Sequence, residues 1–190
     1  MLRSYANRLL AVRQITQTNE GKKTAGIDKE VINTPAQRME FVRKWKEIKP
    51  SPTRRVMIPK PNGKKRLLGI PTIRYRVMKT VVKNALLPEC EAMFEGNSYG
   101  FIPGISCQDA IEKSFIRLQK GRDNWVLEAD IKGFFDNIAH EGILDSISNF
   151  PHRELIREWL KAGFLFQGKI NLTEQGTPQG GVSALRSVQW

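Results

Sequence analysis

Apolar residues recur every three or four positions in several segments of the chain. The first segment covers residues 2 to 16, the second begins near residue 34, and the clearest covers residues 74 to 90. The second has Thr34 as a capping residue, a proline directly after it, and Gln37 three residues after the cap. We therefore predict three helices, over residues 2–16, 34–48 and 74–90.

Three more helices are expected in the second half of the chain. Ser106 and Asp109 have the spacing of a capping box, at the start of a segment that continues to about Lys120. Shorter segments with helical character cover residues 140 to 148 and 151 to 163. The last of these begins at a proline and ends near a glycine, as helices often do.

Strand signals are fewer than helix signals. Asn62-Gly63 is a hairpin turn signal between two short extended segments, so we predict a hairpin over residues 54–70. Residues 164–172 are compatible with a second hairpin, and residues 125–130 have the pattern of a buried strand. Because helices separate only a few strands, the predicted fold class is α+β and not a doubly wound sheet.

Composition narrows the class of protein and of partner. Hydrophobic residues make up 40% and charged residues 26% of the 190 residues, which is typical of a globular protein with one domain or two small subdomains. The net charge of +12 favours a polyanionic partner, and DNA or RNA more often than an anionic membrane surface. A basic protein with a solvated charged face is the alternative.

Several other kinds of chemistry find no support in the residues present. Cys90 and Cys107 lack the spacing of a metal site and are too few for a disulfide framework, so two reduced, mostly buried thiols are expected. His140 and His152 have no partners for a catalytic triad or a zinc site, and surface or capping roles are expected. The sequence has no membrane helix and no secretory signal, so we expect an intracellular, cytoplasmic protein without membrane contact.

Positive charge is concentrated around the predicted hairpin, interrupted only by Glu47. The Lys and Arg residues of this region are Arg43, Lys44, Lys46, Lys49, Arg54, Arg55, Lys60, Lys64, Lys65 and Arg66, with Arg74, Arg76, Lys79 and Lys83 close behind. Such an array suits phosphate oxygens, because bound counterions leave when a polyanion binds. Lys60 and Arg66, on opposite sides of the turn, could close on a triphosphate. A lysine-rich edge that discourages strand aggregation would look the same.

Two further segments could take part in chemistry. Asp130 ends an apolar segment, where a carboxylate needs a compensating cation or hydrogen-bond donors. Mg²⁺ would be a suitable cation, although an aspartate at this place is more often a turn former or a helix cap. The glycines of Thr177–Gly181 would let the backbone approach a flat or charged ligand closely, but the segment lacks the residues of a phosphate-binding P-loop.

Five blocks of sequence, taken in order, resemble the reverse transcriptases of group II introns, often called maturases. Two of them are Ala-Asp-Ile-Lys-Gly-Phe-Phe-Asp-Asn-Ile, which is similar to the first catalytic motif, and Gly-Thr-Pro-Gln-Gly-Gly-Val, which is similar to the next motif of the palm. The blocks are Leu9–Thr16 with Gly21–Asp28, Arg54–Thr72, Asn97–Gly104, Ala129–Ile138 and Gly176–Val182. The resemblance covers about residues 5 to 182.

The resemblance implies a division of the chain. Residues 1–120 would form a fingers-like region with the basic hairpin near 54–70, and residues 121–182 part of a right-hand polymerase palm with the first catalytic motif. Residues 183–190 would be a divergent tail. The fold is then expected to be α+β, the fingers and an incomplete palm.

The resemblance also implies roles for individual residues. Asp130 and the carbonyl of Ile131 would help to hold two Mg²⁺ ions in the complete enzyme, and Phe135 would be the steric gate against a ribose 2′-hydroxyl. Contacts to the incoming dNTP are expected from Lys60, Arg66 and Gln179. Contacts to RNA are expected from Arg54, Arg55, Lys64, Lys65, Arg74 and Arg76. The implied partners are group II intron RNA, an RNA template and a DNA primer.

The chain also departs from the family pattern. The second catalytic segment, Tyr-Ala-Asp-Asp or similar, does not occur, so the chain alone is expected to be inactive as a polymerase. Ile102 and Ile105 stand where the family usually has arginines, and Tyr75 stands where an aspartate is common. The alternatives are an RNA-binding or dimerising fragment without catalysis, or a reverse transcriptase of another class, such as a retron or a diversity-generating element.

Overall fold

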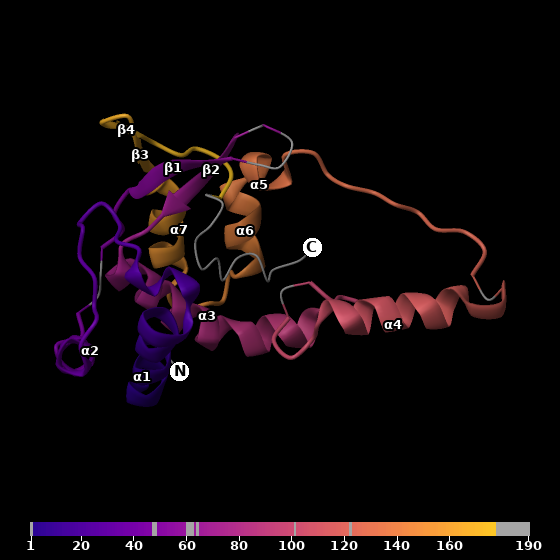
Figure 1. The fold of residues 1–190 in the computed structure, drawn as a ribbon, viewed down its shortest axis with the longest axis horizontal. Coiled ribbons are helices and arrows are strands. Elements are labelled where there is room, and N and C mark those ends of the chain that lie inside the picture. Colours follow the sequence, from indigo (N-terminus) through magenta and orange to yellow (C-terminus); the bar gives the residue numbers. More distant parts are fainter. Residues whose placement is uncertain are drawn as a thin grey trace.

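The computed structural model describes residues 2–46, 49–59, 63, 65–100, 102–121 and 123–177, with the backbone alone at residues 66, 67, 135 and 136 (Figure 1). Its helices are α1 (Tyr5–Arg13), α2 (Pro35–Arg43), α3 (Ile73–Met93), α4 (Cys107–Leu118), α5 (Phe134–Asn137), α6 (His140–Ser146) and α7 (Arg153–Lys161). A π-helix (Gln14–Thr18) continues α1, and short 3-10 helices cover Glu20–Lys23 and Gln119–Gly121. The strands are β1 (Thr53–Pro59), β2 (Lys65–Ile70), β3 (Phe164–Phe166) and β4 (Lys169–Asn171).

The four strands form one sheet with the order β2-β1-β3-β4. β1 and β2 pair antiparallel from Arg54 opposite Ile70 to the turn, and β3 and β4 form a second antiparallel hairpin. Both predicted hairpins are therefore confirmed. β1 and β3 are parallel, with Thr53 opposite Phe164, so the fingers-like region and the partial palm predicted from the sequence share one sheet. The mixed arrangement of helices and sheet confirms the α+β fold class.

Helix α3 is central because it is buried on two faces. Ile73, Val77 and Val81 lie four residues apart and pack in one apolar cluster with residues of α1 and α2. A second cluster packs against α6 and α7, and its α3 members are Tyr75, Met78, Val82, Leu86 and Cys90. Tyr75 contacts Trp159 of α7 edge to face, with ring centroids 5.7 Å apart. The long apolar helix predicted over residues 74–90 thus forms the axis of the domain.

Local capping signals are reproduced at two helices. Thr34 and Gln37 form a reciprocal capping box at the start of α2, and Ser106 and Asp109 form one at the start of α4. Within the part of the chain that the structure describes, no helix is both long and apolar enough to cross a lipid bilayer.

The predicted buried strand over residues 125–130 was wrong. Residues 123–131 form an extended segment outside the sheet, in which the Trp125 and Leu127 side chains are 93% and 90% exposed. A buried strand needs a neighbouring strand for its backbone groups and a second layer for its side chains. Since no described strand pairs with this segment, neither requirement is met by the described residues.

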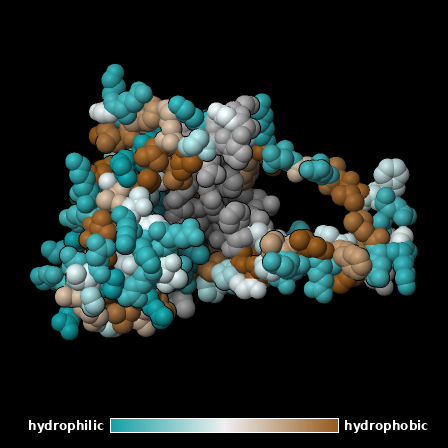
Figure 2. All heavy atoms as spheres, in the orientation of Figure 1, coloured by the Kyte–Doolittle hydropathy of each residue, from teal (hydrophilic) through white to brown (hydrophobic). Residues whose placement is uncertain are grey.

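Helix α4 and the segment after it project together from the rest of the molecule (Figure 1). None of the α4 residues is buried, although Ile111 and Phe115 are large and apolar. Figure 2 shows open space between α4 and the returning chain. We call α4 together with residues 123–131 the projecting arm. Cys107, at the start of α4, is exposed, so the expectation of a buried thiol holds for Cys90 and not for Cys107.

Candidate nucleotide and nucleic-acid site

The basic hairpin is attached to the protein by its two arginines at the start of β1. Arg54 is half-buried, and its Nη2 donates a hydrogen bond of 3.0 Å to the carbonyl of Ala25. The guanidinium of Arg55 lies over the ring of Phe164 in β3, 3.4 Å from the ring centroid. Arg54 and Arg55, two of the residues predicted to contact RNA, therefore also hold the hairpin to the loop at residues 21–28 and to β3.

Arg76 is placed differently from its prediction. Its side chain belongs to a residue only 6% exposed, and Nη1 donates a hydrogen bond of 2.8 Å to the carbonyl of Gly21. Nη2 donates to the carbonyl of Thr24. Burial lowers the pKa of the Arg76 guanidinium from its ordinary value, against the opposing effect of the Asp28 charge. The guanidinium is thus used inside the protein to hold the loop after α1, and this placement argues against the predicted RNA contact.

A glycine in the same loop shows how closely the loop packs. A Cβ atom at Gly26 would lie 2.6 Å from the Cα and the backbone nitrogen of Thr72, just before α3. Arg76 and Gly26 together fix the block at residues 21–28 against the start of α3.

Arg74 and Lys65 remain on the surface. Arg74 forms an ion pair of 2.9 Å with Glu30 and lies over the ring of Phe41, yet its side chain is half exposed to solvent. Lys65 is exposed at the start of β2, beside the hairpin turn. Lys60, Lys64 and Gln179 lie outside the described residues, as do the side chains of Arg66 and Phe135.

Asp130 lies at the end of the projecting arm, directly before a tight turn that leads into α5. Asp130 itself is exposed, and no described strand pairs with its backbone. The Phe134 amide donates a hydrogen bond of 3.2 Å to the carbonyl of Ile131, and Gly133 has a φ of 66°, a left-handed conformation that favours glycine. A carbonyl oxygen has two lone pairs, so the Ile131 carbonyl can still coordinate a metal ion while it accepts the Phe134 hydrogen bond.

The block around Asp130 is joined to the beginning of the Gly176–Gly181 segment. The Gly176 amide donates a hydrogen bond of 2.9 Å to the carbonyl of Ile138, and the carbonyl of Gly176 lies 2.8 Å from His140 Nε2. His140 is 6% exposed, so the expectation of a surface or capping histidine was wrong. Sequence reasoning missed this contact, because the two residues lie 36 positions apart and only the fold brings them together.

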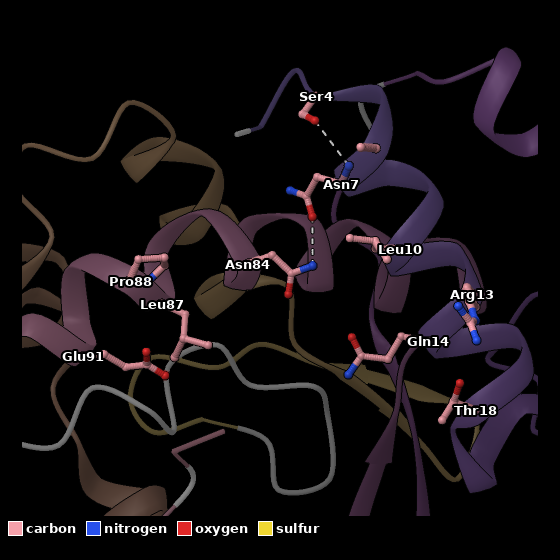
Figure 3. Close-up of a pocket in the computed structure, with 11 residues that line it drawn as sticks. Ser4, Asn7, Leu10, Arg13, Gln14, Thr18, Asn84, Leu87, Pro88 and Glu91 are labelled. Atoms are coloured by element: carbon pink, nitrogen blue, oxygen red, sulfur yellow. Dashed lines mark hydrogen bonds between the residues drawn. The ribbon is translucent and has the colours of Figure 1, made fainter. Parts of the chain in front are cut away.

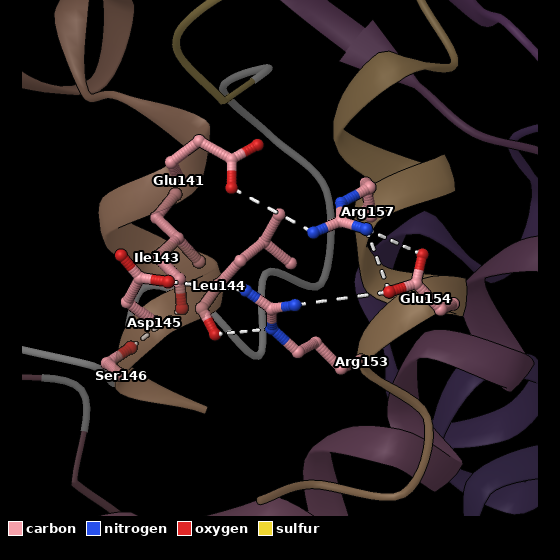
Figure 4. A network of polar contacts seen from close by, with 8 residues as sticks. All are labelled: Glu141, Ile143, Leu144, Asp145, Ser146, Arg153, Glu154 and Arg157. Carbon is pink, nitrogen blue, oxygen red and sulfur yellow. Dashed lines mark hydrogen bonds and ion pairs between the residues drawn. The ribbon is translucent and has the colours of Figure 1, made fainter. Parts of the chain in front are cut away.

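Helix α6, which begins at His140, is held to α7 by a polar network (Figure 4). Arg153 donates from Nε to the Leu144 carbonyl at 2.9 Å and forms an ion pair of 3.2 Å with Asp145. Arg157 of α7 forms an ion pair of 3.9 Å with Glu141 of α6. With the apolar contacts beneath, this network makes α6 a firm support for His140.

A cavity of about 640 Å³ lies on a different side, between α1 and α3 (Figure 3). Within it Asn84 donates a hydrogen bond of 2.8 Å to Asn7, and Asn7 donates one of 3.0 Å to the carbonyl of Val81. Asn7 and Asn84 therefore help to hold α1 on α3.

Comparison with known families decides the class of the protein. Residues 58–189 match the model of the reverse transcriptase (RNA-dependent DNA polymerase) family, and residues 1–45 match the N-terminal domain of reverse transcriptase. The chain belongs to the reverse transcriptase family. The first match begins near the end of β1 and includes β2 of the basic hairpin, the block with Asp130 and the segment that begins at Gly176.

Individual relatives agree with the group II intron resemblance. The group II intron-encoded protein LtrA of Lactococcus lactis subsp. cremoris is 40% identical over 138 residues, which are 70% of this chain and 23% of LtrA. The protein YkfC of Escherichia coli K12 is 33% identical over 188 residues, 92% of this chain and 49% of YkfC. A 91 kDa protein in the cob intron of Schizosaccharomyces pombe is 33% identical over 169 residues, 87% of this chain and 20% of that protein. This reverse transcriptase chain spans half or less of the length of these relatives.

Reverse transcriptases generally use divalent metal ions and act on nucleic acid. The described residues contain no group of three or more His, Cys, Asp or Glu side chains that could hold such an ion. Asp130 and the Ile131 carbonyl can offer two of the hard oxygen ligands that Mg²⁺ takes, together with water and substrate phosphates. The donor set of the described residues therefore does not fit a complete two-ion site.

Proposed function

We propose that the chain is the fingers and the first part of the palm of a group II intron reverse transcriptase. The observation that carries the proposal is the family match over residues 58–189, which includes β2 of the hairpin, the Asp130 block and the segment from Gly176 in one continuous span. The net charge of +12 agrees with a polyanionic partner. The RNA partner we propose is a structured group II intron RNA, with an RNA template and a DNA primer during synthesis.

The roles in nucleotide transfer follow the family motif. Asp130 would be one carboxylate ligand of the divalent ions of a complete palm, and those ions would supply activation of the primer 3′-hydroxyl and stabilisation of the leaving pyrophosphate. Lys60 and Arg66 would contact the triphosphate of a dNTP, and Gln179 would lie beside the nucleotide and template. Phe135 would exclude a ribose 2′-hydroxyl. Support for these roles comes from their order along a chain that belongs to the family.

The chain alone should not extend a primer. Its sequence holds no Tyr-Ala-Asp-Asp segment, and the described residues contain no group of three or more His, Cys, Asp or Glu side chains that could hold a metal ion. Incubation of the purified chain with an RNA template, a DNA primer, dNTPs and Mg²⁺ should give no product. Extension that requires Mg²⁺ and is lost in Asp130→Asn would contradict this expectation.

A second candidate function is RNA binding without catalysis, by the chain alone or as a homodimer. It is favoured by the exposed apolar residues of the projecting arm, such as Phe115 and Trp125, which could contact a second protein surface. Light scattering separates the two forms, because only the dimer would show twice the mass of 21.7 kDa.

RNA binding is the experiment that tests the proposal. A structured group II intron RNA would be titrated with the chain across a salt series, with a DNA duplex of equal length as competitor. Lys65→Gln on the hairpin should lower the salt slope by about 0.7 to 0.9, the amount for one phosphate contact. Lys161→Gln, an exposed lysine at the end of α7, is the matched control and should leave the slope unchanged. Equal affinity for RNA and duplex DNA, with no effect of Lys65→Gln, would overturn the proposal.

A further inference from the structure

The contact between His140 and Gly176 has no part in the roles proposed so far. Both polar backbone groups of Gly176 are taken by residues 138–140: its amide donates to the Ile138 carbonyl at 2.9 Å, and its carbonyl lies 2.8 Å from His140 Nε2. Gly176 and His140 are both buried. A buried carbonyl needs a donor, and here the donor is the side chain of His140, two residues after the end of the Asp130 block.

The chemistry of the contact shows which ring nitrogen donates. A carbonyl oxygen can only accept, so Nε2 must carry the proton. In the neutral ring Nδ1 is then an acceptor, and Nδ1 is buried without a hydrogen-bond partner among the described residues. The imidazole is therefore held by one specific polar contact, to Gly176, and not by a network on both sides.

The contact between His140 and Gly176 joins a helix to the start of the Gly176–Gly181 segment. His140 is the first residue of α6, which is fixed to α7 by the network of Figure 4. Gly176 has a φ of 78°, a left-handed conformation that glycine adopts without strain, and it is the first residue of the Gly176–Gly181 segment. A firm helix thus holds the place where the second family motif begins.

We propose that His140 is a positioning residue of this reverse transcriptase. Its Nε2–H and the Ile138 carbonyl hold Gly176, and thereby fix the start of the Gly176–Gly181 segment to the block that carries Asp130. This role rests on the proposed function, because the register of the two motifs matters only where both meet a nucleotide and template. It goes beyond that function, because His140 is buried and would act through Gly176.

Hydrogen exchange of the Gly176 amide in the whole chain, followed by NMR, tests the proposal. In His140→Phe the ring volume is kept and the donor is lost, so exchange at Gly176 should become about five- to tenfold faster. In His140→Gln a side-chain N–H can take the place of Nε2–H, and exchange should return to within about twofold of the wild type. Amides of α7 should exchange at the wild-type rate in both variants. Unchanged Gly176 exchange in His140→Phe, or equal acceleration in both variants, would overturn the proposal.

A measurement on the wild-type chain needs no variant to fold. Nitrogen chemical shifts of the imidazole report which ring nitrogen carries the proton. A proton on Nε2 is the expected result, and a neutral ring with its proton on Nδ1 would refute the role of His140.

Failure of this inference and failure of the proposed function look different. If the proposed binding of group II intron RNA fails, the wild type shows no preference for intron RNA over duplex DNA, while Gly176 remains protected by His140. If His140 has no positioning role, the RNA preference stands and His140→Phe leaves the Gly176 amide protected.

Discussion

Arg74 and Arg76 lie two residues apart on α3, and the structure gives them opposite tasks. Arg76→Met removes two hydrogen bonds from a charged donor and leaves the Gly21 and Thr24 carbonyls without it. Hydrogen bonds of this kind contribute about 1.5 to 3 kcal/mol each, and the gain from no longer burying the cation offsets part of the loss. We expect Arg76→Met to lower the free energy of unfolding by about 2 to 4 kcal/mol.

Arg74→Met is the matched control. The Arg74–Glu30 pair is exposed, and exposed pairs contribute about 0 to 1 kcal/mol, so stability should change little. Urea unfolding followed by tryptophan fluorescence measures both variants, and the RNA titration across a salt series is repeated with each. Arg74→Met should lower the salt slope by about 0.7 to 0.9 if Arg74 contacts a phosphate.

The opposite pattern would refute the reasoning. If Arg76→Met unfolds within about 0.5 kcal/mol of the wild type and lowers the salt slope, then Arg76 is an RNA contact and the buried placement is wrong.

Three more predictions concern packing and charge. Gly26→Ala should lower the free energy of unfolding by about 1 to 3 kcal/mol, because the new Cβ would lie 2.6 Å from backbone atoms. The Cβ of Gly142→Ala in α6 would meet nothing within 4 Å, so this control variant should raise the free energy of unfolding by about 0.5 to 1 kcal/mol. Equal urea midpoints for the two variants would contradict this prediction. Trp125 is exposed and Trp159 is buried, so in thermal unfolding Trp125→Ala should change the free energy of unfolding by less than about 0.5 kcal/mol and Trp159→Ala should lower it by about 3 to 5 kcal/mol. A large loss in Trp125→Ala would show that the projecting arm is packed against the rest of the protein. Burial lowers the pKa of Lys79 from 10.5 to about 8, so the unfolded chain binds more protons than the folded chain between these pH values. The free energy of unfolding should therefore rise from about pH 8 to pH 10, and Lys79→Met should abolish the rise. An equal rise in Lys79→Met would exclude Lys79 as its origin.

Local signals predicted much of the fold. Capping residues and turn residues act within a few positions, so the helices after Thr34 and Ser106 and the hairpin around Gly63 could be predicted from short stretches of sequence. The pairing of β1 with β3 could not, because Thr53 and Phe164 meet only through the packing of α3 with α6 and α7.

The predictions that were wrong failed because they too depend on contacts between residues far apart in the sequence. An apolar run such as residues 125–130 predicts burial only where a partner surface exists, and the described residues offer none. Arg74 and Arg76 are the same residue type on the same helix, and only the two-sided burial of α3 separates the exposed cation from the buried one. The candidate site was predicted through family blocks and their order, whereas His140 depends on a contact that no local pattern carries.

The order of the sheet bears on how the protein is made. The parallel partner of β1 is β3, which is synthesised about 110 residues later along the chain. At a synthesis rate of roughly 5 to 20 residues per second, this delay lasts on the order of 5 to 20 seconds, during which one edge of the first hairpin stays unpaired. An open edge invites pairing with other nascent chains, and charged side chains discourage it. Arg54 and Arg55 lie at this edge. We therefore expect their charges to discourage such pairing until the hairpin is joined to β3.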